Sequence, residues 1–310
     1  MKKKFGLFGI IIGVIAAFIV FEYLPNPNEP DNTIIKRPSP FNQTTTVYDA
    51  PAKMVIVNNT IYVTVKIEGN ESSKITIPAN DLLFTHKYFF NENHQVYGSE
   101  ISPNPINYEI YKKIGLFNTS KKIVFVYPIF TQAAYDENGF YYYYNKLCDS
   151  RCLTVKIPEE EHGKYTSSIR ATAILSILNY SHITDIDIDK NPDILKKFDR
   201  VIILHNEYVT QKEFDAITSH PDVVYLFPNA LYAEVKTDYT SNTITLIRGH
   251  GYPDSSVSNG FDWKFENSQY EYDNQCDNWF FYKIDNGKML NCYPSFRMYY
   301  DRDLLTAIKQ

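Results

Sequence analysis

The chain has 310 residues, of which 44% are hydrophobic, 15% aromatic and 22% charged. These values exclude a disordered chain, a coiled coil and a collagen-like repeat, and the length is sufficient for one large domain or two small ones. The 31 basic and 36 acidic residues give a net charge of −5. A chain with this charge balance is not expected to bind nucleic acid, so we predict no nucleic-acid partner.

The first residues of the chain predict a membrane anchor. Lysines at positions 2–4 precede an uninterrupted apolar run from Phe5 to Phe21, which as a helix spans about 26 Å, close to the thickness of a bilayer core. A cleaved signal peptide is the alternative, but its apolar region is shorter and ends at a small-residue cleavage site, which the following FEYLPNPNEP does not provide. We therefore predict that residues 1–24 form an uncleaved transmembrane helix.

The anchor predicts where the rest of the chain lies. Because positively charged flanks stay in the cytoplasm, the C-terminal part is expected outside the cell, on a single-pass membrane protein. The 31 basic residues less the three N-terminal lysines leave 28 against 36 acidic residues, a net charge of −8. The external part is therefore acidic, which disfavours binding to anionic lipid.

The four cysteines agree with an oxidising location. Cys148 and Cys152 lie close together in CDSRC, whereas Cys276 and Cys292 bracket a strand-like segment. Four cysteines permit three pairings, and the pairing of neighbours is the simplest of them. A zinc site at CDSRC is the alternative, but only His162 lies near enough in the sequence to add a ligand. We predict two disulfides, no metal ion and no other cofactor.

N-glycosylation is a further expectation of an external location. Sequons of the form N-x-S/T occur at Asn42, Asn58, Asn70, Asn118 and Asn179. The first four are glycosylation candidates. Asn179 lies at the end of a predicted helix and is disfavoured.

Composition and periodicity divide the external part into four segments. Residues 25–46 are rich in Pro, Asn and Thr and predict an extended stalk. Residues 47–110 begin with alternating apolar and polar residues that predict two or three antiparallel strands, but the pattern cannot be assigned from residue 80 onwards. Residues 111–250 predict an α/β domain, and residues 251–310 an aromatic β-hairpin tail.

Apolar runs alternate with amphipathic stretches in the predicted α/β domain. Continuous apolar runs predict buried strands at Ile123–Tyr127, Val201–Leu204 and Val223–Phe227. A further strand of the same sheet is predicted at Thr243–Ile247. Helices are predicted at Ser167–Asn179, after Asn191-Pro192, and after Thr210, which with Glu213 forms a capping box. This alternation is typical of right-handed crossover units. The predicted fold class is therefore α/β, with an open, mostly parallel, doubly wound sheet and helices on both faces.

Two stretches of this domain allow more than one interpretation. FYYYYNKLCDSRCLTVKI predicts a hairpin that turns at Cys148–Cys152. Ile183, Ile186 and Ile188 predict an edge strand whose alternating aspartates block further pairing. A calcium loop is the alternative there, but the glycine and the final glutamate of such a loop are missing.

The tail is rich in aromatic residues. WFFYKI and KMLNCY flank Asp285-Asn286-Gly287, which predicts a hairpin closed by the Cys276–Cys292 disulfide. A short terminal helix is predicted at Arg302–Lys309.

Candidate site residues follow the predicted strands at the edge where α/β sheets bind ligands. They are His205, Glu207, Asn229, Arg248 and His250. A histidine beside a glutamate forms an oriented base, and an arginine can hold a carboxylate. A metal bound by both histidines and the glutamate is an alternative, and ordinary polar loop residues are another.

The stretch from Phe198 to Val235, FDRVIILHNEYVTQKEFDAITSHPDVVYLFPNALYAEV, resembles the class I glutamine-amidotransferase-like fold, a flavodoxin-like fold. The resemblance extends over residues 121–250 and is nearest to the branch with trehalose-utilisation-type and dimethylformamidase-like domains. That fold places a nucleophilic cysteine on a glycine-flanked elbow, but here the elbow reads PNALY. The resemblance therefore implies a binding platform without thiol chemistry. The whole arrangement also resembles archaeal surface proteins anchored to the membrane.

Three functions follow from the sequence. The first is a membrane-anchored binding or cell-envelope component, with an envelope protein or a glycan as its partner. The second is an extracytoplasmic hydrolase that uses His205, Glu207 and His250. The third is carbohydrate recognition by the aromatic tail, which requires exposed rings at Trp263 and Trp279.

Overall fold

The computed structural model describes residues 53–57, 60–66, 74–90, 96–159, 161, 166–265, 270, 273, 275–294 and 296–310. The predicted anchor (1–24), the predicted stalk (25–46) and the sequons at Asn42, Asn58 and Asn70 lie outside the described residues. No helix within these described ranges is long and apolar enough to cross a membrane. The chain divides into two compact units, Met1–Ile106 and Asn107–Gln310.

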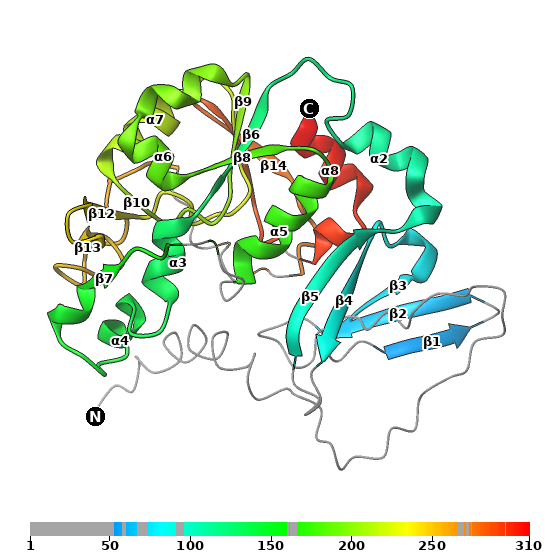
Figure 1. The fold of residues 1–310 in the computed structure, drawn as a ribbon, viewed down its shortest axis with the longest axis horizontal. Coiled ribbons are helices and arrows are strands. Elements are labelled where there is room, and N and C mark those ends of the chain that lie inside the picture. The colour runs from blue at the N-terminus through cyan, green and yellow to red at the C-terminus, as the bar shows by residue number, and fades with distance from the viewer. Residues whose placement is uncertain are drawn as a thin grey trace, which may run out of the picture. The chain divides into compact units, whose positions relative to one another are not determined.

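The first unit is built from β-strands (Figure 1). Strands β1 (Lys53–Val57), β2 (Thr60–Lys66) and β3 (Lys74–Pro78) form an antiparallel sheet, as the alternating sequence predicts. The short 3-10 helix η1 (Ala79–Asp81) follows. Strands β4 (Phe84–Phe90) and β5 (Val96–Pro103) then pair antiparallel in the stretch that the sequence pattern left unassigned.

A six-stranded sheet forms the centre of the second unit. Its order is β14-β15-β11-β9-β6-β8. The strands are β6 (Ile123–Tyr127), β8 (Ser181–Thr184), β9 (Arg200–Ile203), β11 (Val223–Tyr225), β14 (Phe281–Ile284) and β15 (Gly287–Leu290). Every neighbouring pair is parallel except β14–β15. The predicted α/β class with a mostly parallel sheet is confirmed.

Helices lie on both sides of this sheet, with α6 and α7 on one side and α5 and α8 on the other (Figure 1). The α-helices are α2 (Tyr108–Ile114), α3 (Ile129–Tyr135), α4 (Phe140–Tyr144), α5 (Thr166–Ile177), α6 (Asp185–Lys190), α7 (Gln211–Ser219) and α8 (Arg302–Lys309). The 3-10 helices are η2 (Pro105–Asn107), η3 (Ser150–Leu153), η4 (Pro192–Lys197) and η6 (Arg297–Tyr299). Ile188 of α6, Leu195 of η4 and Ile217 of α7 pack into one apolar core with β6, β9 and β11.

Local sequence signals explain where α7 begins. The Thr210 hydroxyl accepts a hydrogen bond from the Glu213 backbone N–H, and the Glu213 carboxylate accepts one from the Thr210 N–H. This confirms the predicted capping box. The terminal helix at Arg302–Lys309 is also confirmed.

A second, four-stranded sheet contains the strand that we expected to extend the central sheet. Its order is β10-β12-β13-β7, with β7 (Thr154–Lys156), β10 (Tyr208–Val209), β12 (Ala233–Asp238) and β13 (Thr243–Arg248). The prediction that Thr243–Ile247 is a fifth parallel strand of the central sheet is wrong. Only four residues join β12 to β13, which permits an antiparallel hairpin but is too short for a parallel crossover.

One further prediction from the sequence is wrong, and another is right only in part. The stretch from Phe140 to Ile157 is not a hairpin, because α4 and η3 precede the short strand β7. The predicted edge strand is present as β8, which contains Ile183 and lies at the edge of the central sheet. Ile186 and Ile188, however, belong to the helix α6, because a capping box at Thr184 starts a helix after β8. The aspartates of this stretch therefore do not form a calcium loop, since Asp187 belongs to the capping box.

Both predicted disulfides are present. Cys148 pairs with Cys152, and Cys276 pairs with Cys292. No free cysteine remains in the part of the chain that the structure describes.

The predicted tail hairpin is also present, and it joins the central sheet. Strands β14 and β15 pair antiparallel, and β15 pairs with β11 in parallel. Gly287 begins β15 opposite Val223, and a Cβ atom at this position would collide with the Val223 carbonyl oxygen. Glycine is therefore required where the hairpin meets the sheet.

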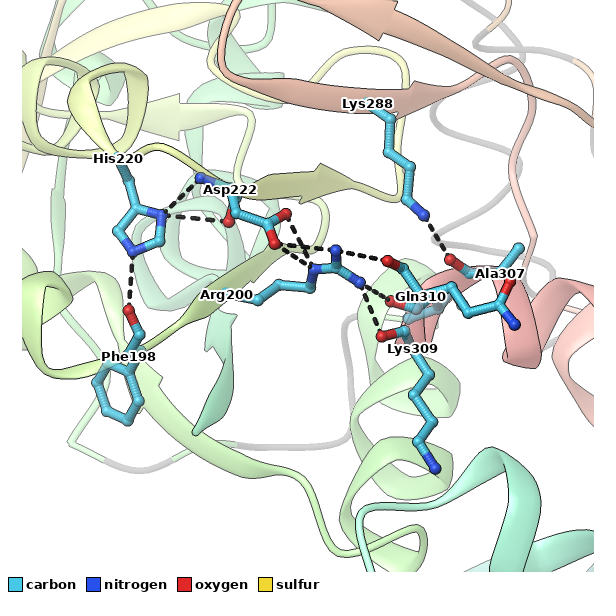
Figure 2. Close-up of polar contacts among 9 residues, drawn as sticks. Phe198, Arg200, His220, Asp222, Lys288, Ala307, Lys309 and Gln310 are labelled. Carbon is cyan, nitrogen blue, oxygen red and sulfur yellow. Dashed lines mark hydrogen bonds and ion pairs between the residues drawn. The ribbon is translucent and has the colours of Figure 1, made fainter. Parts of the chain in front are cut away.

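Arg200 of β9 attaches the terminal helix to the sheet (Figure 2). Its guanidinium forms a bidentate pair with Asp222 and donates hydrogen bonds to the carbonyls of Lys309 and Gln310, each at 2.8 Å. Lys288 of β15 donates to the Ala307 carbonyl. Positive groups therefore satisfy the last carbonyls of α8, where the helix dipole is negative.

We expect Arg200→Leu to lower the free energy of unfolding by about 2–4 kcal/mol, because its side chain is only 9% exposed and its loss leaves Asp222 and the helix carbonyls without their donor. Urea unfolding followed by tryptophan fluorescence measures the change. Arg302→Leu, at the start of the same helix and with a side chain that is 60% exposed, is the matched control. Equal stability of the two variants would contradict this role of Arg200.

Candidate functional site

The candidate site lies at the carboxyl ends of the central strands. His205 and Glu207 follow β9, and Asn229 follows β11. The Asn206 side chain accepts a hydrogen bond from the Leu204 N–H at 3.1 Å and so turns the chain directly after β9. All three predicted site residues on these strands are buried, with Glu207 only 1% exposed.

Three side chains meet at the Glu207 carboxylate. The Tyr135 hydroxyl, at the end of α3, donates a hydrogen bond to Oε2 at 2.7 Å. The Nε2 atom of His250 lies 3.4 Å from Oε1, and the Nε2 atom of His205 lies 3.6 Å from Oε2. We call the group of Glu207, Tyr135, Tyr141, His205 and His250 the Glu207 centre.

A second tyrosine closes a ring of polar contacts within the Glu207 centre. The Tyr141 hydroxyl donates to the Tyr135 oxygen at 2.7 Å and lies 3.4 Å from His250 Nε2. Each tyrosine hydroxyl has one proton, and these contacts use both of them. We therefore assign the His250 proton to Nε2, where it faces both Tyr141 and Glu207.

His205 is oriented by the segment that follows the second disulfide. The Tyr293 hydroxyl donates to Asn229 Oδ1 at 2.9 Å and lies 3.2 Å from His205 Nε2. Because the Tyr293 proton is used by Asn229, His205 Nε2 is the donor in this contact. The backbone N–H of His205 donates to the Ser168 hydroxyl of α5 at 3.1 Å.

Burial keeps both histidines neutral. Desolvation lowers the pKa of His205 to about 3 and that of His250 to about 4. Burial and the charge of Glu207 raise the pKa of Tyr135 well above its ordinary value. At pH 7 the Glu207 centre therefore contains neutral imidazole and phenol groups around one buried carboxylate.

Four tyrosine rings surround the imidazole of His250, and we call them the tyrosine cage. Their ring centroids lie 4.6 to 6.3 Å from the centroid of His250, with Tyr144 stacked at 4.6 Å. The members of the cage are Tyr141 and Tyr144 of α4, Tyr208 of β10 and Tyr232, which precedes β12. The cage therefore joins three separate segments of the chain.

A tight turn presents His250 to this cage. His250 has a φ of 56° and Gly251 a φ of 78°, and Gly249 and Tyr252 exchange two backbone hydrogen bonds across them. The His250 N–H also donates to the Ser258 carbonyl at 2.8 Å. The left-handed backbone at a residue other than glycine is thus held by its surroundings.

Arg248 is directed elsewhere. Its guanidinium pairs with Asp262 at 2.7 Å and donates to the Gly260 carbonyl. The structure therefore brings His205, Glu207, Asn229 and His250 together and turns Arg248 away from them.

Sequence reasoning missed the tyrosines of the site. Tyr141 falls in the stretch wrongly predicted as a hairpin, Tyr135 precedes that stretch at the end of α3, and Tyr293 lies far along the chain in the tail. The run of four tyrosines at 141–144 was the available signal. A high tyrosine content of 26 residues hid it, because most tyrosines in such a chain have no site role.

Two observations limit the chemistry of the site. Within the described ranges, no group of three or more His, Cys, Asp or Glu side chains has an arrangement that could hold a metal ion. The cysteines that the structure describes are all in disulfides, so none of them is a free thiol.

The tryptophans of the tail are engaged within the second unit. Trp263 packs against the apolar core, and its ring lies 5.4 Å from that of Tyr225. Trp279 donates a hydrogen bond from its indole N–H to Asp301 at 2.9 Å. Both rings are half-buried.

Comparisons with known proteins leave the family of this chain open. No protein-family model matches the sequence. No curated protein matches it at a significant level. What the structure supports is the class, an α/β protein with a mostly parallel mixed sheet.

We expect His205 to make the folded chain less stable in acid. Its pKa of about 3 lies below the ordinary value of 6.5, so the unfolded chain binds one more proton between these values. The stability that neutral His205 contributes is therefore full above pH 6.5 and is lost as the pH falls toward 3, at about 1.4 kcal/mol per pH unit.

Urea unfolding at pH 5.5 and at pH 4.5 measures how the free energy of unfolding changes with pH. As the pH falls by one unit, the free energy of unfolding of His205→Gln should decrease by about 1.4 kcal/mol less than that of the parent chain. His182→Gln is the control, because the His182 side chain is 44% exposed. The same slope in the parent chain and in His205→Gln would show that His205 does not stay neutral.

Proposed function

We propose that this protein is a membrane-anchored, extracytoplasmic binding component whose α/β domain holds its ligand at the Glu207 centre. One observation carries the proposal. Glu207, His205 and His250 come from segments far apart in the sequence and meet with Tyr135 and Tyr141 around one buried carboxylate. Ligands of α/β proteins bind at this edge of the sheet.

The external location rests on the N-terminal sequence and the cysteines. The lysines at positions 2–4 and the apolar run over residues 5–21 support a single-pass anchor with the C-terminal domain outside. Two disulfides support an oxidising compartment. Asn118 is exposed, which suits N-glycosylation there.

We propose that the α/β domain is a degenerate form of the class I amidotransferase-like fold. A site at the carboxyl ends of parallel strands supports this kinship. The predicted elbow, PNALY, contains no cysteine, which argues against thiol chemistry. A binding role with an envelope protein or a glycan as partner needs no nucleophile. Carbohydrate recognition by the aromatic tail stays a prediction.

The expected topology can be measured in intact cells that express the full chain. A membrane-impermeant maleimide should label none of the four cysteines before reduction. After an impermeant reductant is added it should label Cys148 and Cys152, which are partly exposed, whereas Cys276 and Cys292 are buried. External protease should remove the chain beyond residue 46. Failure of the reagent to label Cys148 and Cys152 after reduction, together with protection from protease, would overturn the external location.

Hydrolysis is a second candidate, and one observation favours it. The Nε2–H of His250 faces the Glu207 carboxylate, which leaves the lone pair of the neutral imidazole on Nδ1. A carboxylate that orients the opposite nitrogen is the arrangement of a histidine general base. The His250 side chain is 32% exposed, so it is the member of this pair nearer to solvent.

Hydrolysis of p-nitrophenyl acetate and of a p-nitroanilide by the purified full chain tests this candidate. If His250 is a general base, His250→Gln should lower the rate by about 10²-fold or more, and Glu207→Gln should lower it as well. His182→Gln should keep the parent rate. A rate no higher than that in buffer alone, or equal rates in all variants, would exclude hydrolysis as the function of this centre.

A further inference from the structure

We propose that the Glu207 centre and the tyrosine cage form a binding site for an alkylated ammonium group, and that the His250 imidazole occupies the position of this cation in the structure. The inference rests on the proposed function, because it names a ligand class for the same centre. It also assigns a role to His250, as an internal occupant that the ligand displaces.

The tyrosine cage supplies the aromatic part of such a site. A cation is attracted to the face of an aromatic ring when it lies within about 6 Å of the ring centroid. The centroids of Tyr144, Tyr232 and Tyr141 lie 4.6, 5.7 and 5.9 Å from the centre of the His250 ring, and Tyr208 follows at 6.3 Å. A small cation at the centre of that ring would therefore lie within this distance of three ring centroids, with Tyr208 just beyond it.

Glu207 supplies the charge. Its Oε1 atom is the oxygen that faces the cage, because it lies 3.4 Å from His250 Nε2. The other oxygen, Oε2, is held by the Tyr135 hydroxyl at 2.7 Å. The attraction between an ammonium group and this carboxylate would be strong, because both would lie in a region from which water is largely excluded.

His250 is the loosely held member of the centre. Its contacts to Tyr141 and to Glu207 are both 3.4 Å long, whereas good hydrogen bonds of this type are about 2.7–3.2 Å. The tyrosine contacts around it are 2.7 Å long. The His250 backbone is fixed by its turn, so displacement of the imidazole requires a rotation of its side chain.

The route into the cage and the charge of the chain agree with a cationic ligand. Tyr141, Tyr144 and Tyr232 are half-buried, whereas Tyr208 and Glu207 are buried beneath them. The site thus has an aromatic rim and a carboxylate floor. The excess of acidic residues in the chain attracts cations toward it.

Titration calorimetry on the detergent-solubilised full chain tests the proposal with two probes of the same number of non-hydrogen atoms. Tetramethylammonium chloride carries the charge, and tert-butyl alcohol lacks it. We expect tetramethylammonium to bind the parent chain weakly and His250→Ala at least tenfold more tightly. We expect tert-butyl alcohol to bind neither, at the same chloride concentration.

Variants of the cage and of the carboxylate separate the two contributions. In the His250→Ala background, Tyr144→Leu should weaken tetramethylammonium binding at least fivefold, and Glu207→Gln at least tenfold. Tyr142→Leu, on the same helix but outside the cage, should leave the affinity unchanged. Near-ultraviolet circular dichroism of each variant checks its fold, and the Tyr144 and Glu207 variants test the cage independently of each other.

Three outcomes would overturn the inference. Equal binding of both probes would reveal an apolar cavity without charge selectivity. Weaker tetramethylammonium binding by His250→Ala would make His250 a wall of the site and not its occupant. Binding of glycerol in place of tetramethylammonium would reveal a polyol site. None of these calorimetric outcomes bears on the external location of the domain. That location is tested by the cysteine labelling in intact cells, and its failure would overturn the proposed function whatever the calorimetry finds.

Discussion

The burial of the Glu207 carboxylate is the constraint on which the site depends. A buried carboxylate is stable only where hydrogen-bond donors meet it. Here the Tyr135 hydroxyl of α3 donates to the carboxylate, and the His250 imidazole of the turn after β13 faces it at 3.4 Å. These segments must therefore pack at one edge of the central sheet for the chain to fold. The same requirement draws α4 into place, because Tyr141 holds the Tyr135 hydroxyl.

The C-terminal segment completes both the sheet and the site. Strand β15 extends the sheet beyond β11, and Arg200 holds the terminal helix against β9. Between these elements, Tyr293 reaches Asn229 and His205. The Cys276–Cys292 disulfide ends one residue before Tyr293 and so restrains the segment that orients His205. A tail that looks like an appendage in the sequence is thus part of the core of the second unit.

The geometry of the centre connects its two possible kinds of activity. A neutral imidazole oriented by a carboxylate is suited to proton transfer, and the same carboxylate among tyrosine rings is suited to a cation. Which of them operates depends on His250. As a fixed side chain it serves as a base, and as a displaceable one it yields its place to a ligand. The long contacts of His250, beside the short contacts among the tyrosines, favour displacement.

The sequence by itself determined the α/β class, the buried strand Ile123–Tyr127, the capping box at Thr210 and the tail hairpin, because each depends on neighbouring residues or on continuous apolar runs. It predicted the two disulfides only as the simplest of three pairings, and the structure confirms them. It also placed His205, Glu207 and Asn229 after central strands. Only the tertiary structure decided that β13 belongs to another sheet, that Arg248 turns to Asp262, and that Tyr135, Tyr141 and Tyr293 join the site. These features depend on contacts between residues far apart in the chain. A local sequence pattern does not predict which distant hydrogen-bond donor will contact a buried carboxylate.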